Sequence, residues 1–565
     1  MSTKASRSNT FEGNNVPKLT KVLFPWSGIF RDACYALIGT FLLQYAITSG
    51  VLSSDPEIFK AQYGVITIAM IFALIWDGIN DPIMGFILEK CHFKAGKFRP
   101  WIKYGAIGNA ATVAIMFLFP LIFSGLRGWG YVVFMIIMYL LWDLFFSMND
   151  IGYWSMLPAL TNDASQRAKL TTNCAIAASV GTFIMNIAMF VLPGWLPLST
   201  IWIYAITGIS VAVFFLLSQL FVYFYCQEKV RDAEQEAVSE QSSILDLFRV
   251  VIKNKELRYA AIGMLLYYFA SFVLTGIGQN YFYMVYGYGG NKGGMVATVI
   301  AAIYVIGTVV AQAFFPKLAA KFKRKSILTA STIVVMIAYV AFFLVAFPVF
   351  GDQPLAYNTP DGNNMFWVFG GSMALIYLFS FLFFGAAGIF YLVVLIMFQD
   401  AIDYGELTTG ERKESICFAW RPLDVKLASG LNRGLQYLTY ALTGTAVFIT
   451  AISNAEGDFN SRYDPSQPAS YQETIETLRN TEIEAARAEY VTREKLIWFG
   501  VIIIGVIIIL FAVSYFLLRF KYSLDEEKME KVVAELEEVH KQHEQNNNSQ
   551  VEEKPEELVE EVKEE

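Results

Sequence analysis

The sequence of 565 residues is poor in charge. Charged residues make up 16% of it and hydrophobic residues 55%, whereas an ordinary soluble protein carries about 25% charged residues. This balance excludes an ordinary soluble domain and predicts a chain that lies largely in a membrane. Residues 1–16 are polar, so no cleavable signal peptide is expected at the start.

Cysteine and histidine are scarce as well. The five cysteines are far apart in the sequence, at positions 34, 91, 174, 226 and 417, so neither a disulfide framework nor a zinc site is expected. The three histidines stand at 92, 540 and 543, outside the apolar stretches, which excludes an imidazole proton relay in the membrane. The glycine-rich stretch 287–294 lacks the spacing of a phosphate-binding loop. We therefore expect no enzyme, no cofactor and no nucleic-acid partner.

Apolar runs long enough to cross a bilayer recur along the chain. Six precede a charged linker at 227–257 and six follow it. This layout predicts an all-α membrane protein with twelve transmembrane helices in two six-helix bundles, which is the major facilitator fold. The runs lie near 26–50, 61–89, 101–125, 129–158, 168–194, 200–226, 258–286, 294–321, 326–350, 366–400, 415–453 and 494–520.

The pattern also predicts how the chain is divided and oriented. Basic residues gather in the loops after the second and eighth runs, around 90–103 and 317–325, so both termini are expected in the cytoplasm of a cell inner or plasma membrane. The loop 454–493 is then expected outside, with helix-forming composition over 470–495, and we expect a monomer. The segments are a tail at 1–24, a first bundle at 25–226, the linker at 227–257, a second bundle at 258–521 and an acidic tail at 522–565, in which a short helix is expected.

Three polar residues interrupt the second run. Asp77 and Asp81 are four residues apart with Asn80 between them, so all three share one face of a helix. A carboxylate near the middle of a membrane helix costs roughly 2.5–3.5 kcal/mol, whereas a Leu or Phe returns about 0.3–0.6 kcal/mol. Such a pair indicates a polar pathway through the membrane; a polar contact between helices is the alternative.

Three other runs carry charge. The first has Arg31 and Asp32. The fourth has a stripe with spacings of 4, 3 and 4 residues, and the eleventh has three charged residues near its start. Charges of both signs in both bundles are tolerated where they converge on a shared cavity; for Asp143 a structural ion pair is the alternative. The stripe is Asp143, Ser147, Asp150 and Trp154, and the charges of the eleventh run are Arg421, Asp424 and Lys426.

Two carboxylates, an amide and a hydroxyl are hard oxygen ligands of the kind that suit a small alkali cation. Two close carboxylates can also share a proton. The choice between Na⁺ and H⁺ as a coupling ion therefore stays open. The four candidate cation ligands are Asp77, Asn80, Asp81 and Ser147.

These residues stand in recognisable motifs. The segment 76–85, Trp-Asp-Gly-Ile-Asn-Asp-Pro-Ile-Met-Gly, and the segment 96–101, Gly-Lys-Phe-Arg-Pro-Trp, resemble the signature of the glycoside–pentoside–hexuronide:cation symporter family, whose type is the melibiose permease. The resemblance covers about 18–450 and the last helix. Further matches are Asp-Ile-Gly-Tyr-Trp at 150–154, Asp-Tyr-Gly-Glu at 403–406, and Glu-Ser-Ile at 414–416 leading to Lys426.

The resemblance implies two sites and a function. Asp77, Asn80, Asp81 and Ser147 would bind the coupling cation. Carboxylates of the sugar site would accept hydroxyl hydrogen bonds, and its indole would stack on a pyranose ring. The expected function is import of a glycoside or oligosaccharide, coupled to Na⁺ or H⁺, by alternating access. The residues that match the family's sugar site are Arg31, Asp32, Asp150, Trp154, Tyr391 and Lys426.

The chain departs from the family's pattern at the sugar site. Ala175 stands where an arginine is usual, and Arg421, Pro422 and Asp424 differ from the usual neighbours of Lys426. These changes argue against melibiose itself as the substrate. Arg421 could bind a uronate carboxylate or pair with Asp424. The alternatives are a hexuronide or glucuronide symporter, a lysolipid symporter, against which the dense charge speaks, and a sugar sensor that does not transport.

Overall fold

The computed structural model describes residues 10–11, 16–91, 93, 96–161, 164–196, 198–229, 249, 251–289, 291–361, 364–409, 420–464, 466–536 and 538. Over these residues the chain is helical apart from connecting loops and one pair of two-residue strands, β1 (Thr10–Phe11) and β2 (Glu228–Lys229), which pair in parallel. The parts of the expected linker and acidic tail at 230–248 and 539–565 lie outside the described residues.

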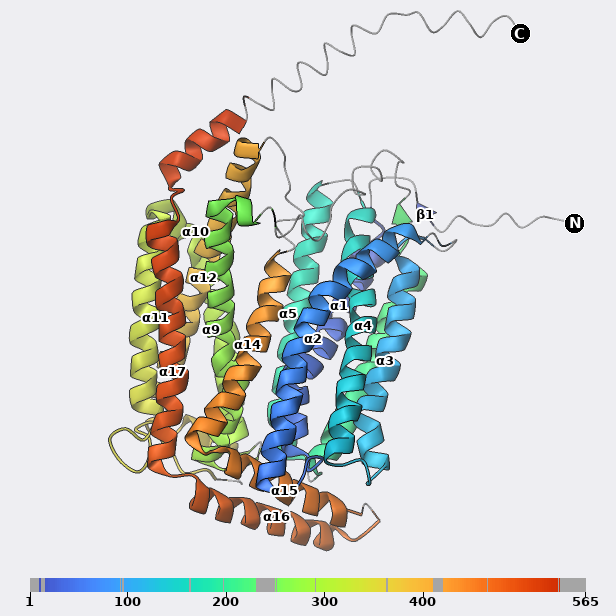
Figure 1. Cartoon of the computed structure of the whole chain (residues 1–565), viewed down its shortest axis with the longest axis vertical. Helices are drawn as coiled ribbons and strands as arrows, with labels where there is room; N and C mark the ends of the chain where they lie inside the picture. Colours follow the sequence, from blue (N-terminus) through green and yellow to red (C-terminus); the bar gives the residue numbers. More distant parts are fainter. Residues whose placement is uncertain are drawn as a thin grey trace, which may run out of the picture.

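Within the described chain, twelve helices of 23 to 37 residues form two groups of six (Figure 1). The predicted major facilitator fold is thus confirmed. The first group is α1 (Lys18–Thr48), α2 (Pro56–Lys90), α3 (Arg99–Ile122), α4 (Trp129–Ala159), α5 (Ala164–Trp195) and α6 (Thr200–Tyr225). The second is α9 (Lys255–Tyr286), α10 (Gly293–Lys321), α11 (Arg324–Ala346), α12 (Met373–Thr409), α14 (Trp420–Thr443) and α17 (Arg493–Phe516). A 3₁₀ turn (Met365–Phe369) precedes α12, and a π turn (Leu517–Lys521) ends α17.

The helices are apolar enough for a membrane. Eight of those described are individually long and apolar enough to cross one: α3, α4, α6, α9, α10, α11, α12 and α17 with its π turn. The more polar α14 packs against α2, α9 and α17, and its charged residues Asp424 and Arg433 are buried among other helices rather than exposed to lipid.

Local sequence sets the register of the helix that carries the acidic pair. The Asp55 carboxylate accepts hydrogen bonds from the amides of Glu57 and Ile58, both at 3.0 Å, and Pro56 occupies the first helical position. An aspartate cap followed by proline is a strong signal for the start of a helix. The aspartate accepts hydrogen bonds from backbone amides of the first turn, and proline has no backbone amide hydrogen that would need a partner. Residues 77, 80 and 81 lie in the continuous helix that begins at this cap, and their spacing of three and four residues puts them on one face of it.

The two halves meet along α2 and α14 and along α5 and α10. Several hydrogen bonds join them through the C-terminal halves of α1, α9 and α14, helices that run toward the end of the bundle opposite the two termini (Figure 1). Gln44 of α1 and Asn280 of α9 exchange amide hydrogen bonds of 2.9 and 3.0 Å. Arg433 of α14 donates to the carbonyl of Gly39 at 2.9 Å and to the Tyr139 hydroxyl at 3.3 Å. The halves are therefore closed against each other at this end.

The structure differs from the sequence expectation at the eleventh helix. We expected one span to 453, but α14 ends at Thr443, and the chain turns at Gly444, whose φ is +66°. Only glycine adopts such a conformation readily. The next helix, α15 (Ala446–Arg462), leaves at a bend of 102°.

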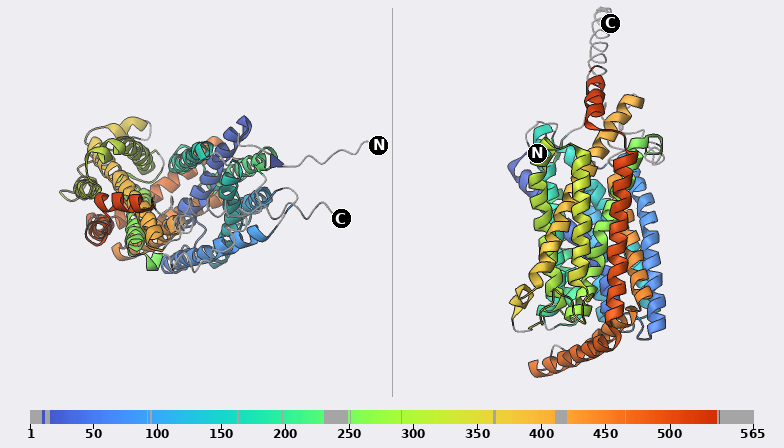
Figure 2. Two further views of the ribbon diagram at one scale, coloured as in Figure 1. Left: turned by 90° about the horizontal axis from the view of Figure 1, so that it is seen from above. Right: turned by 90° about the vertical axis from the view of Figure 1, so that its left-hand side faces the viewer.

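The segment expected as an outer loop is largely helical. After α15 comes α16 (Ala469–Tyr490), which accounts for the helix-forming composition of 470–495. The two helices form a hairpin across the end of the bundle opposite the termini (Figures 1 and 2). At the other end, residues 526–536 form the expected short tail helix, whose Met529 and Val532 are buried.

Helices α1 and α5 touch through a glycine. A Cβ atom on Gly181 of α5 would overlap the carbonyl oxygen of Ile29 on α1. This contact lies two residues from Arg31, so the close approach of the two backbones also positions the charged part of α1.

We predict that Gly181→Ala lowers the free energy of unfolding by about 1–3 kcal/mol, because the extra methyl must push α5 away from α1. A thermal unfolding scan in detergent measures this loss. Gly505→Ala on α17 is the matched control, since nothing lies within 4 Å of its added Cβ. Equal unfolding temperatures for the two variants would contradict the packing described here.

Candidate functional site

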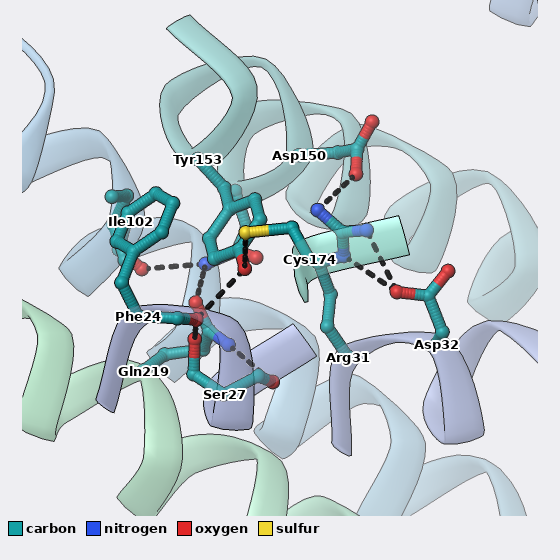
Figure 3. A network of polar contacts seen from close by, with 10 residues as sticks. Phe24, Ser27, Arg31, Asp32, Ile102, Asp150, Tyr153, Cys174 and Gln219 are labelled. Atoms are coloured by element: carbon teal, nitrogen blue, oxygen red, sulfur yellow. Dashed lines mark hydrogen bonds and ion pairs between the residues drawn. The ribbon is translucent and has the colours of Figure 1, made fainter. Parts of the chain in front are cut away.

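The centre of the site in the first half is Arg31 on α1. Its guanidinium lies 2.7 and 3.1 Å (Nη2 and Nε) from the Asp32 carboxylate and 3.2 Å (Nη1) from that of Asp150 on α4 (Figure 3). The arginine side chain is 3% exposed, whereas the two carboxylates are 21% and 35% exposed. The cation is thus buried beneath two anions that keep part of their surface accessible.

Two aromatic rings complete this cluster. The Arg31 guanidinium lies 4.3 Å from the centre of the Tyr153 ring and 4.8 Å from that of Trp154, and each contact favours the cation. Tyr153 is held in place because its hydroxyl donates to the Phe24 carbonyl at 2.8 Å and its ring stacks on Phe24 at 4.4 Å. Trp154 is 37% exposed. Sequence reasoning missed Tyr153, although it stands within the motif at 150–154.

This cluster has a definite chemical capacity. Carboxylates accept hydrogen bonds strongly, and an exposed indole beside them offers a flat apolar face with a polar edge. A ligand with several hydroxyl groups and an apolar ring face fits both. Arg31 does not need to contact such a ligand, because its contacts with Asp32 and Asp150 already orient the two acceptors.

The predicted cation ligands lie on two helices in contact, α2 and α4. Asn80 and Ser147 are both buried, with 3% and 4% exposure. The side chains of Asp77 and Asp81 lie outside the described residues, although both positions are helical in α2. The Asn80 amide nitrogen is buried and has no hydrogen-bond partner among the described residues.

A buried amide normally has a partner. A half-turn of the Asn80 amide about its last torsion would present an oxygen at the same point, which is the atom that an alkali cation prefers. The buried position of Ser147 on the facing helix is compatible with the same use. The described residues therefore fit a cation ligand set.

In the second half, the predicted Tyr391 and Arg421 are brought together by a third residue. The Tyr268 hydroxyl on α9 donates to the Tyr391 hydroxyl at 3.1 Å and accepts from Arg421 Nε at 3.3 Å. Tyr391 also stacks on Tyr267, with ring centres 5.1 Å apart. Sequence reasoning missed both tyrosines, because in a chain this rich in aromatics a Tyr-Tyr pair carries little signal.

The structure also bears on the two roles considered for Arg421. No ion pair joins Arg421 to Asp424 among the described contacts, and the Asp424 carboxylate is buried beside the Trp420 side chain. Arg421 itself is exposed. Lys426, five residues further along α14, is half-buried.

Of the predicted sugar-site residues, Arg31, Asp32, Asp150 and Trp154 thus form a cluster in the first half, and Tyr391 and Arg421 form one in the second. Helix α2 packs against both α4 and α14, so the positions 77, 80 and 81 lie on the helix between the two clusters. Position 175, where the family's arginine is absent, lies on α5, which packs against α1.

Sequence similarity to known proteins identifies the family of this chain. The family model described as MFS/sugar transport protein matches residues 56–526. The chain belongs to this family. The resemblance found in the sequence is thereby confirmed, and the chain is a multi-pass membrane protein of the MFS/sugar transport family.

Two relatives within this family are named for sugars. The lactose permease of Lactobacillus helveticus is 27% identical over 488 residues, which are 82% of this chain and 70% of that protein. The raffinose carrier protein of Pediococcus pentosaceus is 23% identical over 448 residues, 77% of this chain and 64% of that protein. The chain therefore spans about two thirds of the length of these relatives.

A solved structure shows the same fold. It is that of a bacterial homolog of the human lysosomal transporter Spinster, in an inward-facing and unoccupied conformation, with a TM-score of 0.52 and 14% identity. The match covers 88% of this chain and 95% of that one.

The cluster around Arg31 leads to a prediction about stability. Asp32→Asn or Asp150→Asn alone leaves one anion beside the buried cation, so each should cost about 1–3 kcal/mol of unfolding free energy. The double variant leaves Arg31 without either carboxylate and should cost roughly 3–5 kcal/mol. Thermal unfolding in detergent measures all three. As a control, Asp458→Asn breaks an exposed pair with Arg462 and should change stability by less than about 1 kcal/mol. A double variant as stable as this control would show that Arg31 does not depend on the two carboxylates.

Proposed function

We propose that the chain is a cation-coupled symporter that imports a glycoside or oligosaccharide by alternating access. The observation that carries the proposal is the pair of partly exposed carboxylates, Asp32 and Asp150, held by a buried arginine beside the exposed indole of Trp154. Family membership supports sugar transport in general. The names of the relatives, for a two-ring and a three-ring sugar, support an oligosaccharide.

In this proposal the sugar binds in the first half by two kinds of contact. Its hydroxyl groups donate to Asp32 and Asp150, and one apolar ring face lies on Trp154. Arg31 acts as a positioning residue, because its contacts with the two carboxylates hold them in orientation before the sugar arrives. Such preorganisation reduces the entropy lost on binding. Lys426, Tyr391 and Arg421 would contact the sugar from the second half.

The coupling ion, Na⁺ or H⁺, would bind at Asp77, Asn80, Asp81 and Ser147. The helix α2 supports this because it contacts the sugar-site helix α4 and also α14 of the other half. An ion that favours sugar binding must be favoured by the sugar to the same extent, since coupling between sites is reciprocal. This reciprocity lets an ion gradient drive sugar uptake.

The two halves would then rock about the site between them. The basic segments around 90–103 and 317–325 support a cytoplasmic location for both termini, which puts the α15–α16 hairpin outside. The contacts of Gln44, Asn280 and Arg433 described above then close the outer side, so the conformation described is one that is shut toward the outside.

A second candidate is import of an acidic glycoside such as a hexuronide. The exposed Arg421 favours it, because this cation has a phenol as its described hydrogen-bond partner and forms no described ion pair with Asp424. A guanidinium in that state is able to bind a carboxylate with two hydrogen bonds.

We predict that Asp81→Asn reduces gradient-driven accumulation of the sugar at least about tenfold, because the coupling ion loses an anionic ligand. Uptake into proteoliposomes, under a Na⁺ gradient and separately under a pH gradient, measures this and identifies the ion. Asp352→Asn, at an exposed outer loop position, is the control. If the Asp81 variant accumulates as much sugar as the control, the proposed coupling site is wrong.

We further predict that lactose or raffinose raises the thermal unfolding temperature of the wild type. Trp154→Ala should weaken the apparent affinity for that sugar about tenfold or more, because the indole supplies the stacking face. Leu141→Ala, at another exposed apolar position of α4, should leave the affinity unchanged. Stabilisation by a glucuronide alone, lost in Arg421→Gln, would select the second candidate instead. If no sugar or glucuronide shifts the unfolding temperature, the sugar-site assignment is wrong.

A further inference from the structure

The α15–α16 hairpin contacts both halves. Helix α15 packs against α1 and α2 of the first half, and α16 lies along α15 (Figures 1 and 2). The backbones of Gly50, with φ of +71°, and Gly457 on α15 lie so close that a Cβ on Gly50 would overlap Gly457. Asn454 donates to the Ser54 carbonyl at 3.1 Å. The hairpin thus joins the halves at the end opposite the termini.

A buried carboxylate lies at the centre of this junction. Glu456 on α15 is 1% exposed. One of its oxygens accepts from the backbone amide of Thr200 at 2.9 Å, and the other accepts from the Tyr288 hydroxyl at 2.9 Å. Thr200 is the first residue of α6, in the other half. An anion at the first amide of a helix is favourable because that end carries a partial positive charge.

The charge of Glu456 is balanced by α16. Arg479 lies 3.3 Å from Glu456, is 6% exposed, and places its guanidinium 4.7 Å from the Phe459 ring. Burying an unpaired carboxylate is costly, so this arginine is what permits Glu456 to lie inside the protein. The pair belongs entirely to the second half of the chain.

Helix α16 is in turn held to the second half. Glu484 lies 2.8 Å from Arg487 on its own helix and 3.1 Å from Lys292 in the turn before α10. Burial acts to raise the pKa of the Glu484 carboxyl, but these two cations hold it below its usual value. Arg487 also donates to the Val285 carbonyl at 3.2 Å. These contacts fasten α16, which carries Arg479, to the second half of the chain.

We propose that the α15–α16 hairpin is a latch on the outer end, in which Glu456, held by Arg479, closes the two halves by capping α6. The inference rests on the proposed alternating-access cycle. When the halves part, Glu456 exchanges the Thr200 amide for water but retains Arg479 and Tyr288, which move with it. At Glu456, opening therefore costs one charge-assisted hydrogen bond and leaves no unpaired buried charge. The latch biases the closed state without locking it.

The latch is tested by a distance across the outer end. Spin labels at Glu57→Cys on α2 and Asp352→Cys after α11, both exposed, report the separation of the halves in the full-length chain in nanodiscs, without sugar. Cys91 and Cys417 are replaced by serine in this background. Glu456→Gln should raise the ratio of long to short distances at least about fivefold, because it weakens the cap and leaves Glu476 as the one described anionic partner of Arg479.

A matched pair at Thr200 isolates the hydrogen bond itself. Thr200→Pro removes the amide donor at a first helical position, which proline tolerates, and Ser199 before it already has the extended conformation that proline requires, with ψ of 155°. Thr200→Val keeps the amide and removes the hydroxyl. We expect the ratio of long to short distances to be about tenfold higher in the proline variant than in the valine variant. Arg462→Gln, which breaks an exposed ion pair within α15, should match the wild type.

Unchanged distances in both Glu456→Gln and Thr200→Pro would overturn the latch, and the proline variant decides alone if the glutamine variant does not fold. Uptake assays separate this result from the proposed function. If the spin-label distances change in these variants but the wild type takes up no sugar, the latch is supported and the transport proposal is contradicted. If the wild type takes up sugar but the spin-label distances are the same in all variants, the latch alone is contradicted.

Discussion

The buried guanidinium of Arg31 is the interaction on which the candidate site depends. A charge with 3% exposure inside a membrane helix bundle is tolerable only with anionic partners. Asp32 and Asp150 supply them from α1 and α4, and the rings of Tyr153 and Trp154 lie 4.3 and 4.8 Å from the cation. The requirement to neutralise one buried cation thus fixes two carboxylates and an indole in one place. The proposed sugar site follows from that constraint.

The same constraint appears at the other end of the bundle with the signs reversed. There the buried charge is the Glu456 carboxylate, and its partners are Arg479, a phenol and a helix N-terminus. The difference lies in where the partners stand. Arg31 finds both anions within the first half, so its cluster moves as a unit. Glu456 shares its hydrogen bonds between the halves, so one of them must break when the halves separate. A buried ion pair thereby serves structure in one case and, in our proposal, conformational balance in the other.

The interface between the halves is polar where the described hydrogen bonds cross it. The side-chain amides of Gln44 and Asn280 form two hydrogen bonds with each other, and Arg433 donates hydrogen bonds to a carbonyl and a phenol of the first half. Water can replace each of these partners when the end opens, so the net cost per bond is modest. An interface with this composition suits a protein that must close and open repeatedly. The glycine contact between positions 50 and 457 adds a close approach of backbones that tolerates no larger side chain.

Much of this protein is determined by its sequence alone. Runs of apolar residues fix the number and order of the long helices, because a helix that crosses a bilayer needs a continuous apolar length. The spacing of 4, 3 and 4 residues predicted that Asp150 and Trp154 share a face of α4, and Arg31 and Asp32 were identified because charge in an apolar run is costly. What the sequence could not supply is which helices meet. The stacking of Tyr153 on Phe24, the link through Tyr268, and the contact of Glu456 with the start of α6 each join residues more than a hundred positions apart. Likewise the break at Gly444 is visible as one glycine among 40, and only the packing of the hairpin against both halves decided that the chain turns there. Local sequence patterns reflect the free-energy cost of moving charged and polar side chains out of water. Which residues of different helices become partners depends on how the helices pack.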